Sequence, residues 1–202
     1  MTVASAALTA SARHKFILAS ASPRRRDLLA QIGLTADAVI PADIDETPLA
    51  GELPRLHALR LASEKAAKIA QGHSGKVILA ADTVVGVGRR ILPKTETEAE
   101  ARACLELISG RAHRVFTGIC VIDPTGQSRT RVSETRIKLK RLSREEQDAY
   151  IASCEWQGKA GGYGIQGYAG AFVSSLNGSY SGVVGLPLFE TRALLKAAGL
   201  KL

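Results

Sequence analysis

The sequence predicts an α/β fold built on a mixed, twisted sheet flanked by helices. Three observations support this class. Short apolar or β-branched runs alternate with longer stretches of helical periodicity along the 202 residues. An expected hairpin within residues 115–140 adds antiparallel pairing to the sheet. Late glycine-rich segments, 158–170 and 178–185, are interpreted as loops at the mouth of a cleft between strand ends.

The first strand and helix have the clearest boundaries in the sequence. The apolar run over 16–19 is expected to form a strand. Ser22 can cap the helix that follows, with Pro23 at its first position, and Gly33 can close it.

Hydrophobic periodicity and capping signals predict the further elements. A helix is expected from about Leu53 to Ala70, ended by Gly72, with a buried stripe at Leu56, Leu59, Ala62, Ala66 and Ile69. Ser143 and Glu146 form a capping box for a helix that reaches about Ser153. Between these helices we expect a strand over 77–81, a helix over 97–108, and a hairpin of strands 115–122 and 129–140 around a turn at 123–126.

Composition places the chain among ordinary globular proteins. Apolar residues make up 46% and charged residues 23%, and no apolar run approaches the roughly 20 residues of a membrane-spanning helix. Residues 1–14 lack the features of a secretory signal and are expected to be a disordered extension, whereas 15–202 form a single domain. The net charge of +8 predicts an anionic partner without separating a nucleic acid from a small polyphosphate.

The cysteines and histidines show no metal-ligand spacing. Three cysteines without a CxxC pair argue against a disulfide framework and favour a reducing cytoplasm, and small buried hydrophobic roles are expected for Cys104, Cys120 and Cys154. Surface or capping roles are expected for His14, His57 and His73, while the role of His113 stays open.

The segment from Ser20 to Arg25 is the most informative local pattern. It places Arg24 and Arg25 on the first turn of a helix that follows a strand. Backbone N–H groups, the helix dipole and guanidinium forks converge there, which suits a phosphate chain. The same residues also fit a solvated helix start, so both interpretations remain open on the local pattern alone.

A single aspartate and one acidic cluster could hold a divalent cation or activate water. Asp82 follows the run over 77–81 and is expected at a strand end, where functional carboxylates often lie in α/β sheets. Glu46 belongs to an acidic cluster with Asp43 and Asp45 that could supply oxygen ligands to Mg²⁺. A turn-opening aspartate and a solvated acidic loop are the competing interpretations.

Several blocks, taken in order, carry a family resemblance. The chain resembles the Maf family of nucleoside triphosphate pyrophosphatases from about Phe16 to its end, in the blocks 19–25, Asp45-Glu46, Glu64-Lys65-Ala66, Ala81-Asp82-Thr83-Val84, Ser109-Gly110-Arg111 with His113 and Thr117, 159–167 and 178–188. The resemblance implies two lobes around a central nucleotide-binding cleft, and it makes a homodimer plausible.

The resemblance also implies a role for each candidate residue. Asp82 matches the family's catalytic base, and with Glu46 it is expected to contact a divalent ion, Mg²⁺ or Mn²⁺. Catalytic roles at the phosphates are expected for Lys65 and Lys94, and substrate contacts for Ser22, Arg24, Arg25, Thr83 and Gln166. Pro93 precedes Lys94 where the family often has glycine, so the shape of this loop is left open.

The late loop favours one subgroup of the family. Gln166 offers a donor and an acceptor that match the O4 and N3–H edge shared by thymine and uracil. The resemblance is to the subgroup acting on dTTP and UTP, in which the positions of Arg24, Thr83 and Gln166 are linked with substrate choice. Gly162 stands where the subgroup often has alanine, and little effect is expected.

Two alternatives are weaker. The subgroup acting on 7-methyl-GTP differs in the late loop and over 177–181. A nucleic-acid-binding regulator of cell division would suit the basic charge, but no ladder of aromatic residues accompanies the basic ones. The chain also lacks a P-loop motif. We therefore expect a nucleoside triphosphate as partner, with neither a membrane nor a stable nucleic-acid complex.

Overall fold

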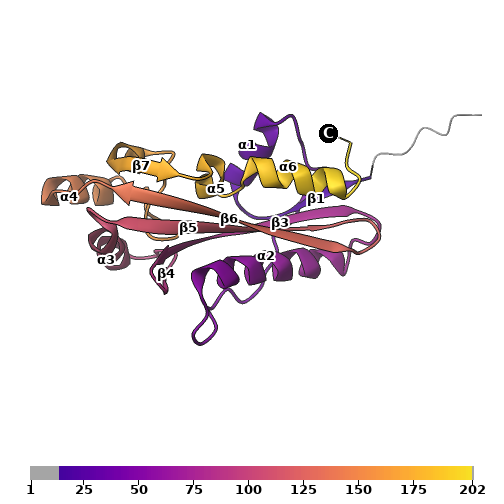
Figure 1. Ribbon diagram of the computed structural model, residues 1–202, viewed down its shortest axis with the longest axis horizontal. Coiled ribbons are helices and arrows are strands. Elements are labelled where there is room, and N and C mark those ends of the chain that lie inside the picture. Colours follow the sequence, from indigo (N-terminus) through magenta and orange to yellow (C-terminus); the bar gives the residue numbers. More distant parts are fainter. Residues whose placement is uncertain (1–13, 202) are drawn as a thin grey trace, which may run out of the picture.

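A computed structural model describes residues 14–201, so nearly all of the expected extension lies outside the described residues (Figure 1). Seven strands form one sheet: β1 Phe16–Ala19, β2 Ala38–Val39, β3 Val77–Val87, β4 Arg90–Leu92, β5 Ala112–Ile122, β6 Ser128–Leu139 and β7 Val173–Asn177. The helices are α1 Pro23–Gln31, α2 Pro54–Ala70, α3 Glu98–Ile108, α4 Arg144–Ala152, α5 Tyr180–Val184, α6 Leu188–Ala197 and a 3₁₀ turn at Tyr168–Phe172. Among the described residues, no helix is both long enough and apolar enough to span a membrane.

The sheet is mixed, as the sequence predicts. Its strands lie in the order β2-β1-β3-β5-β6-β7, and β4 pairs with β3. Strand β1 is parallel to β2 and β3, whereas the other neighbours are antiparallel. The expected hairpin is confirmed as β5 and β6, which pair from Ala112 opposite Lys138 to Ile122 opposite Ser128.

One edge of β3 is left open in its middle. Strand β1 pairs with β3 as far as Ala19 opposite Ala80, and β4 pairs with the same edge from Val85 onward. Within the described chain, residues 81–84 therefore have no strand partner on this edge. A ligand can reach the centre of the sheet at this gap, directly beside the turn that leads from β1 into α1.

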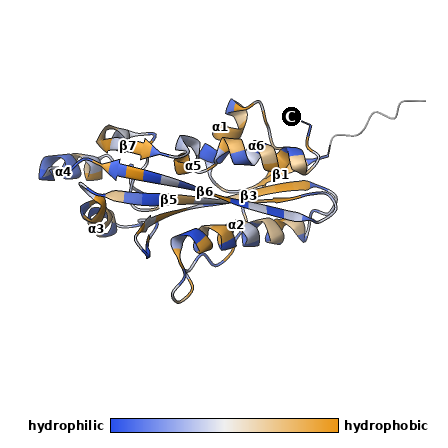
Figure 2. Cartoon of the chain, viewed as in Figure 1, coloured by the Kyte–Doolittle hydropathy of each residue, from blue (hydrophilic) through white to orange (hydrophobic). Residues whose placement is uncertain are grey.

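Helices cover both faces of the sheet. Helix α2 lies along one face, and α1, α5 and α6 lie on the other (Figure 1). Alternation along β1 sends Phe16 and Leu18 into the larger core and Ile17 and Ala19 into the smaller core beneath α2. Figure 2 shows the matching pattern, since hydrophobic residues gather on β1 and β3 while α4 is largely hydrophilic.

The contact between α2 and β5 is very close. A Cβ atom added at Gly118 in β5 would lie 2.2 Å from the backbone oxygen of Ala58 in α2, so this position accommodates only glycine. The backbone of the helix therefore rests almost directly on the strand. Lys65 lies about two helical turns further along the same helix, so its height above the sheet is fixed by this contact.

The structure describes one continuous sheet, and the two lobes implied by the resemblance stay a prediction. Elements β1 and α1 lie toward one end of the sheet, and α3, α4 and β7 lie at the other (Figure 1). The predicted boundaries of α1 are confirmed, because Pro23 begins it and Gly33 has a φ of 72° just after it. Ser22 holds the N-cap position, yet its side chain makes no capping hydrogen bond.

Strand β3 is longer than predicted. It continues to Val87, so the expectation that Asp82 lies at a strand end is wrong. The extra length comes from antiparallel pairing with β5, in which Asp82 lies opposite Gly118. The glycine-rich segment 178–185 also contains a helical turn, α5, where only a loop was expected.

The buried face of α2 differs from the predicted stripe. Leu56 is 54% exposed, whereas His57 and Lys65 are buried. The periodicity assignment failed because these two polar residues occupy the face that packs on the sheet, and both are paired there. His57 Nδ1 lies 2.8 Å from a carboxylate oxygen of Glu52, so the expected surface or capping role is wrong for this histidine.

Two of the three cysteines are buried, as expected. Burial raises the pKa of the Cys104 and Cys120 thiols. Cys154 is exposed and has a φ of 57°, so the expectation of a buried residue is wrong there. It lies in the turns that follow α4 rather than on a packed helix face.

Candidate active site

The residues proposed from the sequence meet in one cavity. It has a volume of about 580 Å³ and lies at the open edge of β3. Its walls include all nine proposed residues: Ser22, Arg24, Arg25, Glu46, Lys65, Asp82, Thr83, Lys94 and Gln166.

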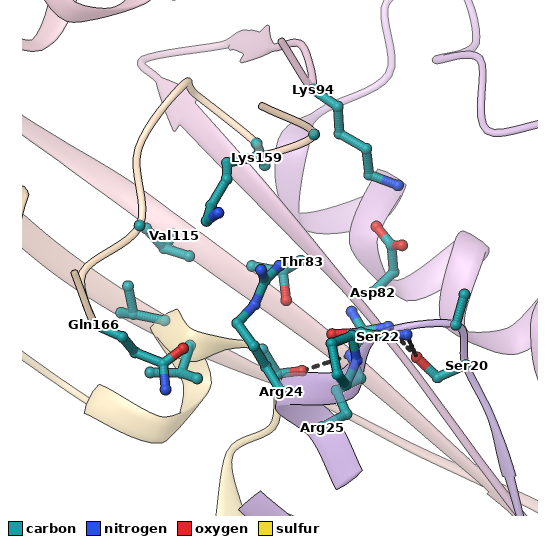
Figure 3. Close-up of a pocket in the computed structure, with 18 of the residues that line it drawn as sticks. Ser20, Ser22, Arg24, Arg25, Asp82, Thr83, Lys94, Val115, Lys159 and Gln166 are labelled. Carbon is teal, nitrogen blue, oxygen red and sulfur yellow. Dashed lines mark hydrogen bonds between the residues drawn. The ribbon is translucent and has the colours of Figure 1, made fainter. Parts of the chain in front are cut away.

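The cavity has two chemically different ends. In Figure 3, Asp82 and Lys94 approach each other on one side, and Gln166 lies on the other. Arg24 and Thr83 lie between them. A ligand with an anionic chain and a hydrogen-bonding ring would match this order of groups.

Positively and negatively charged side chains alternate at the end of the cavity that contains Asp82 and Lys94. Lys65 Nζ lies 2.6 Å from Asp82 Oδ1 and 2.5 Å from Glu46 Oε1, and Lys94 pairs with the other Glu46 oxygen. Asp82 and Lys65 are buried, whereas the Glu46 and Lys94 side chains are 35% and 46% exposed. A buried charge requires a partner, so Lys65 and Asp82 hold each other in place.

Glu46 remains ionised at neutral pH. Burial raises its pKa, but the hydrogen bonds from Lys65 and Lys94 outweigh this effect and lower the pKa to about 2. Of the acidic cluster, Glu46 is the member that lines the cavity. Asp43 and Asp45 are exposed, and Asp45 accepts a hydrogen bond from the Thr47 backbone, so the solvated-loop interpretation describes these two.

The paired carboxylates fit a hard divalent cation in part. One cation, the Lys65 ammonium, already bridges Glu46 and Asp82. The described residues contain no group of three or more His, Cys, Asp or Glu side chains suited to a metal. Two protein carboxylates completed by water and phosphate oxygens are nevertheless a usual arrangement for Mg²⁺.

The start of α1 brings positive charge to the middle of the cavity. Arg24 extends into it in Figure 3. Arg25 is clamped, because its Nε donates to the Gly185 carbonyl at 2.9 Å and its Nη1 donates to Ser20 Oγ at 3.0 Å. Burial lowers the pKa of Arg25, against the opposing influence of Asp82. This clamp joins the first turn of α1 to the end of α5.

Thr83 is held by the neighbouring strand. Its Oγ1 lies 3.0 Å from Oγ1 of Thr117 in β5. Thr117 in turn donates to the Gly182 carbonyl in α5 at 2.7 Å. The two threonines lie directly opposite each other in the sheet, so their contact is set by strand register.

The loop before Lys94 is joined to the late loop. The Pro93 carbonyl accepts a hydrogen bond from Gly161 at 2.9 Å, and Lys94 forms a bridge with Ala160. Thr95 Oγ1 donates to the Trp156 carbonyl at 2.7 Å. The departure from glycine at position 93 is therefore accommodated, because this loop uses the carbonyl of Pro93 and not its missing N–H.

Lys159, Val115 and Tyr163 are among the cavity residues that were not proposed from the sequence. Lys159 and Val115 appear beside the others in Figure 3, and Tyr163 lines the same wall. Burial lowers the pKa of Lys159, and the nearby Arg24 adds to the effect. Lys159 lay within the family-like segment 159–167, which was a usable signal, whereas Val115 and Tyr163 have the appearance of ordinary core residues.

His113, whose role was open, supports Tyr163 from beneath. It is 3% exposed, its Nε2 lies 2.6 Å from the Tyr163 hydroxyl, and its Nδ1 has no hydrogen-bond partner in the described structure. Burial lowers the pKa of His113 to about 4, so the imidazole is neutral at neutral pH. This histidine packs behind the cavity wall.

The fold and the cavity define an α/β protein with a charged, anion-matching cavity at the open edge of a mixed sheet. A family model described as Maf-like protein matches residues 15–198. The chain therefore belongs to the Maf family.

Two relatives agree with this assignment, and one solved structure shares the fold. A dTTP/UTP pyrophosphatase from Caulobacter vibrioides is 62% identical over 183 residues, which cover 91% of this chain and 95% of the relative. A dTTP/UTP pyrophosphatase from Maricaulis maris is 63% identical over 199 residues, covering 98% and 94%. A HAM1 protein from Coxiella burnetii, 19% identical, shares the fold with a TM-score of 0.50 over 91% of this chain and 99% of that one.

Proposed function

We propose that this chain hydrolyses dTTP and UTP to the nucleoside monophosphate and pyrophosphate, and that modified nucleotides are among its substrates. The observation that carries the proposal is the meeting of all nine predicted residues in one cavity with a charged end and a Gln166 end. The names of the relatives from Caulobacter vibrioides and Maricaulis maris support the same substrates.

The triphosphate would occupy the charged end. Arg24, Arg25, Lys65 and Lys94 would neutralise its negative charge, which is the main requirement of phosphoryl transfer. Glu46 and Asp82 would hold a divalent ion, Mg²⁺ or Mn²⁺, which supplies further charge neutralisation at the phosphates when bound.

Asp82 would act as the general base. A water oxygen attacks the α-phosphorus, its proton passes to the Asp82 carboxylate, and the bond from the α-phosphorus to the bridging oxygen breaks so that pyrophosphate leaves. Lys65, 2.6 Å from Asp82 Oδ1, orients the carboxylate for this step. Ser22 would contact the phosphates from the N-cap of α1.

The deciding experiment measures pyrophosphate release from dTTP, UTP, CTP, dATP, GTP and 7-methyl-GTP with Mg²⁺ or Mn²⁺. We expect selective turnover of dTTP and UTP, loss of activity on chelation, and a fall of at least about 100-fold in Asp82→Asn. Preference for 7-methyl-GTP would move the chain to the other subgroup. Salt-dependent binding of DNA or RNA without any turnover would favour the nucleic-acid-binding regulator instead.

We further propose a cytoplasmic homodimer. The family resemblance supports the dimer, and three free cysteines support a reducing compartment. Sedimentation analysis of the purified protein tests the first, and fractionation of its host cells tests the second.

A further inference from the structure

A chain of three hydrogen-bonding groups crosses the sheet behind the cavity. Thr117 Oγ1 lies 2.7 Å from the Gly182 carbonyl and 3.0 Å from Thr83 Oγ1. A carbonyl oxygen has no proton to give, so the only hydroxyl proton of Thr117 points to Gly182. Thr117 is 1% exposed, which keeps solvent from competing for this proton.

The proton of Thr83 is fixed as a result. The Thr117 hydroxyl already donates its one proton to the Gly182 carbonyl. The hydrogen bond between the two hydroxyls therefore forms only if Thr83 donates to Thr117. Thr83 therefore presents only lone pairs to the cavity that it lines. A hydroxyl that can ordinarily donate or accept becomes an obligatory acceptor.

Such a fixed acceptor supplies a distinction that Gln166 cannot make by itself. Uracil and thymine carry a proton on N3, whereas N3 of cytosine is an acceptor. The exposed Gln166 carboxamide can turn over and present either its oxygen or its NH₂ group, so it can serve both kinds of ring. A group of fixed polarity would reject cytosine because two acceptors would face each other.

We propose that Thr117 is a specificity-determining positioning residue, which locks Thr83 as an acceptor for the N3–H of uracil and thymine and thereby excludes cytosine. The inference rests on the proposed function for the identity of the substrates. The selection of uracil and thymine over cytosine would then depend on the direction of the buried Thr117 hydroxyl proton. Thr117 does not touch the ligand and acts through Thr83, which does.

The test compares three variants of the full chain. Thr117→Val keeps the shape and removes the hydroxyl, so Thr83 becomes free to donate to N3 of cytosine. Thr117→Ser restores the hydroxyl. Thr135→Val is the matched control, because Thr135 is also buried and its Oγ1 anchors Ser179 just before α5 through contacts of 2.9 and 3.2 Å, without touching Thr83.

The measurement is kcat and KM for dTTP, UTP and CTP, with thermal unfolding of each variant. We expect Thr117→Val to lower the preference for UTP over CTP by about tenfold, mainly through a lower KM for CTP. Thr117→Ser should stay within about threefold of the parent, and Thr135→Val should lower stability while the preference is unchanged.

Two results would overturn the inference. One is a folded Thr117→Val variant whose preference for UTP over CTP is unchanged. This includes an equal fall in kcat/KM for all nucleotides, which would indicate that Thr83 accepts a hydrogen bond from the sugar and not from the base. The other is an equal change of preference in Thr135→Val. If the parent chain turns over no nucleotide, the proposed function fails on its own, and calorimetric binding of UMP and CMP to the same variants then decides the inference by the same ratio.

Discussion

Lys65 and Asp82 are 17 positions apart in the sequence, yet each allows the other to be buried. From periodicity alone, a lysine in the middle of a helix is expected to face solvent, and an aspartate after an apolar run is expected to open a turn. Only the resemblance to a family indicated that both have functional roles. Their pairing depends on the docking of α2 on β3, which no local pattern encodes.

Removal of the Lys65 charge is expected to affect both stability and turnover. Lys65→Met leaves the Asp82 carboxylate buried without its cation, which costs about 3–5 kcal/mol in the free energy of unfolding. Urea unfolding and pyrophosphate release measure the two effects, and turnover should fall by at least about 100-fold. Lys68→Met, on the exposed side of the same helix, should change neither. Near-parental values for Lys65→Met would contradict the pairing.

Gly162 is expected to be required for stability, although its presence in place of the subgroup's alanine was expected to have little effect. Its φ is 71°, and an added Cβ would lie 3.3 Å from Ala101 Cα and Thr95 Cγ2. Gly162→Ala is therefore expected to lower the free energy of unfolding by at least about 1–2 kcal/mol. Gly75→Ala is the control, because Gly75 has a φ of 72° with open space around it. Chemical unfolding of both variants separates the cost of backbone strain from that of steric crowding. Equal losses in the free energy of unfolding would show that crowding at Gly162 contributes nothing.

At the scale of single elements, local signals predicted what local chemistry determines. Both capping boxes, at the starts of α3 and α4, involve residues three positions apart, and the one proposed at Ser143 is confirmed. The short strands β2, β4 and β7 were not assigned, because two to five residues carry too little periodicity and each depends on a neighbouring strand. The length of β3 was missed because its second half depends on antiparallel pairing with β5, which is distant in the sequence.

The joined loops around Thr95 lead to a prediction for these elements. Thr95→Val removes the hydrogen bond to the buried Trp156 carbonyl, which should cost about 1–3 kcal/mol and loosen the adjacent Lys94. We expect a lower kcat for dTTP as well as a lower melting temperature. Thr97→Ala removes the cap of α3 and should cost about 1 kcal/mol with kcat unchanged. Equal kcat in the two variants would show that the loop junction does not position Lys94.

Over the whole molecule, the sheet order could not be read from the sequence, but the class of fold could. Alternation of short and long apolar patterns is a property of each segment, whereas the insertion of β3 between β1 and β5 is a property of the assembled core. The cavity draws on residues from Ala19 to Gly185, and the family blocks, rather than any spacing rule, brought them together in advance.

Stability of the whole domain is expected to fall as the medium becomes acidic. Burial lowers the pKa of His113 from 6.5 to about 4, so the unfolded chain takes up the proton more readily. This contribution, roughly 3 kcal/mol, is complete above pH 6.5 and is lost as the pH falls toward 4. Urea unfolding between pH 4 and 8 measures it, and His113→Gln should flatten the curve in this window. A parental slope in that variant would contradict the assignment.

Glu46 affects stability over a lower pH range than His113. Its pKa is lowered from 4.5 to about 2, so its stabilising effect is present above pH 4.5 and disappears as the pH falls toward 2. Glu52, paired with Arg60 outside the cavity, also has its pKa lowered to about 2. Loss of stability near pH 3 is therefore shared by Glu46 and Glu52, whereas loss near pH 5 belongs to His113 behind the cavity wall.

Gly118 carries a consequence for how this chain can change over evolutionary time. Every side chain larger than hydrogen would push the Ala58 backbone away, and with it the helix that delivers Lys65. A position with no contact to any ligand is thus as intolerant of replacement as a catalytic one. Substitutions can accumulate on the exposed face of α2, but the distance between α2 and β5 must stay constant.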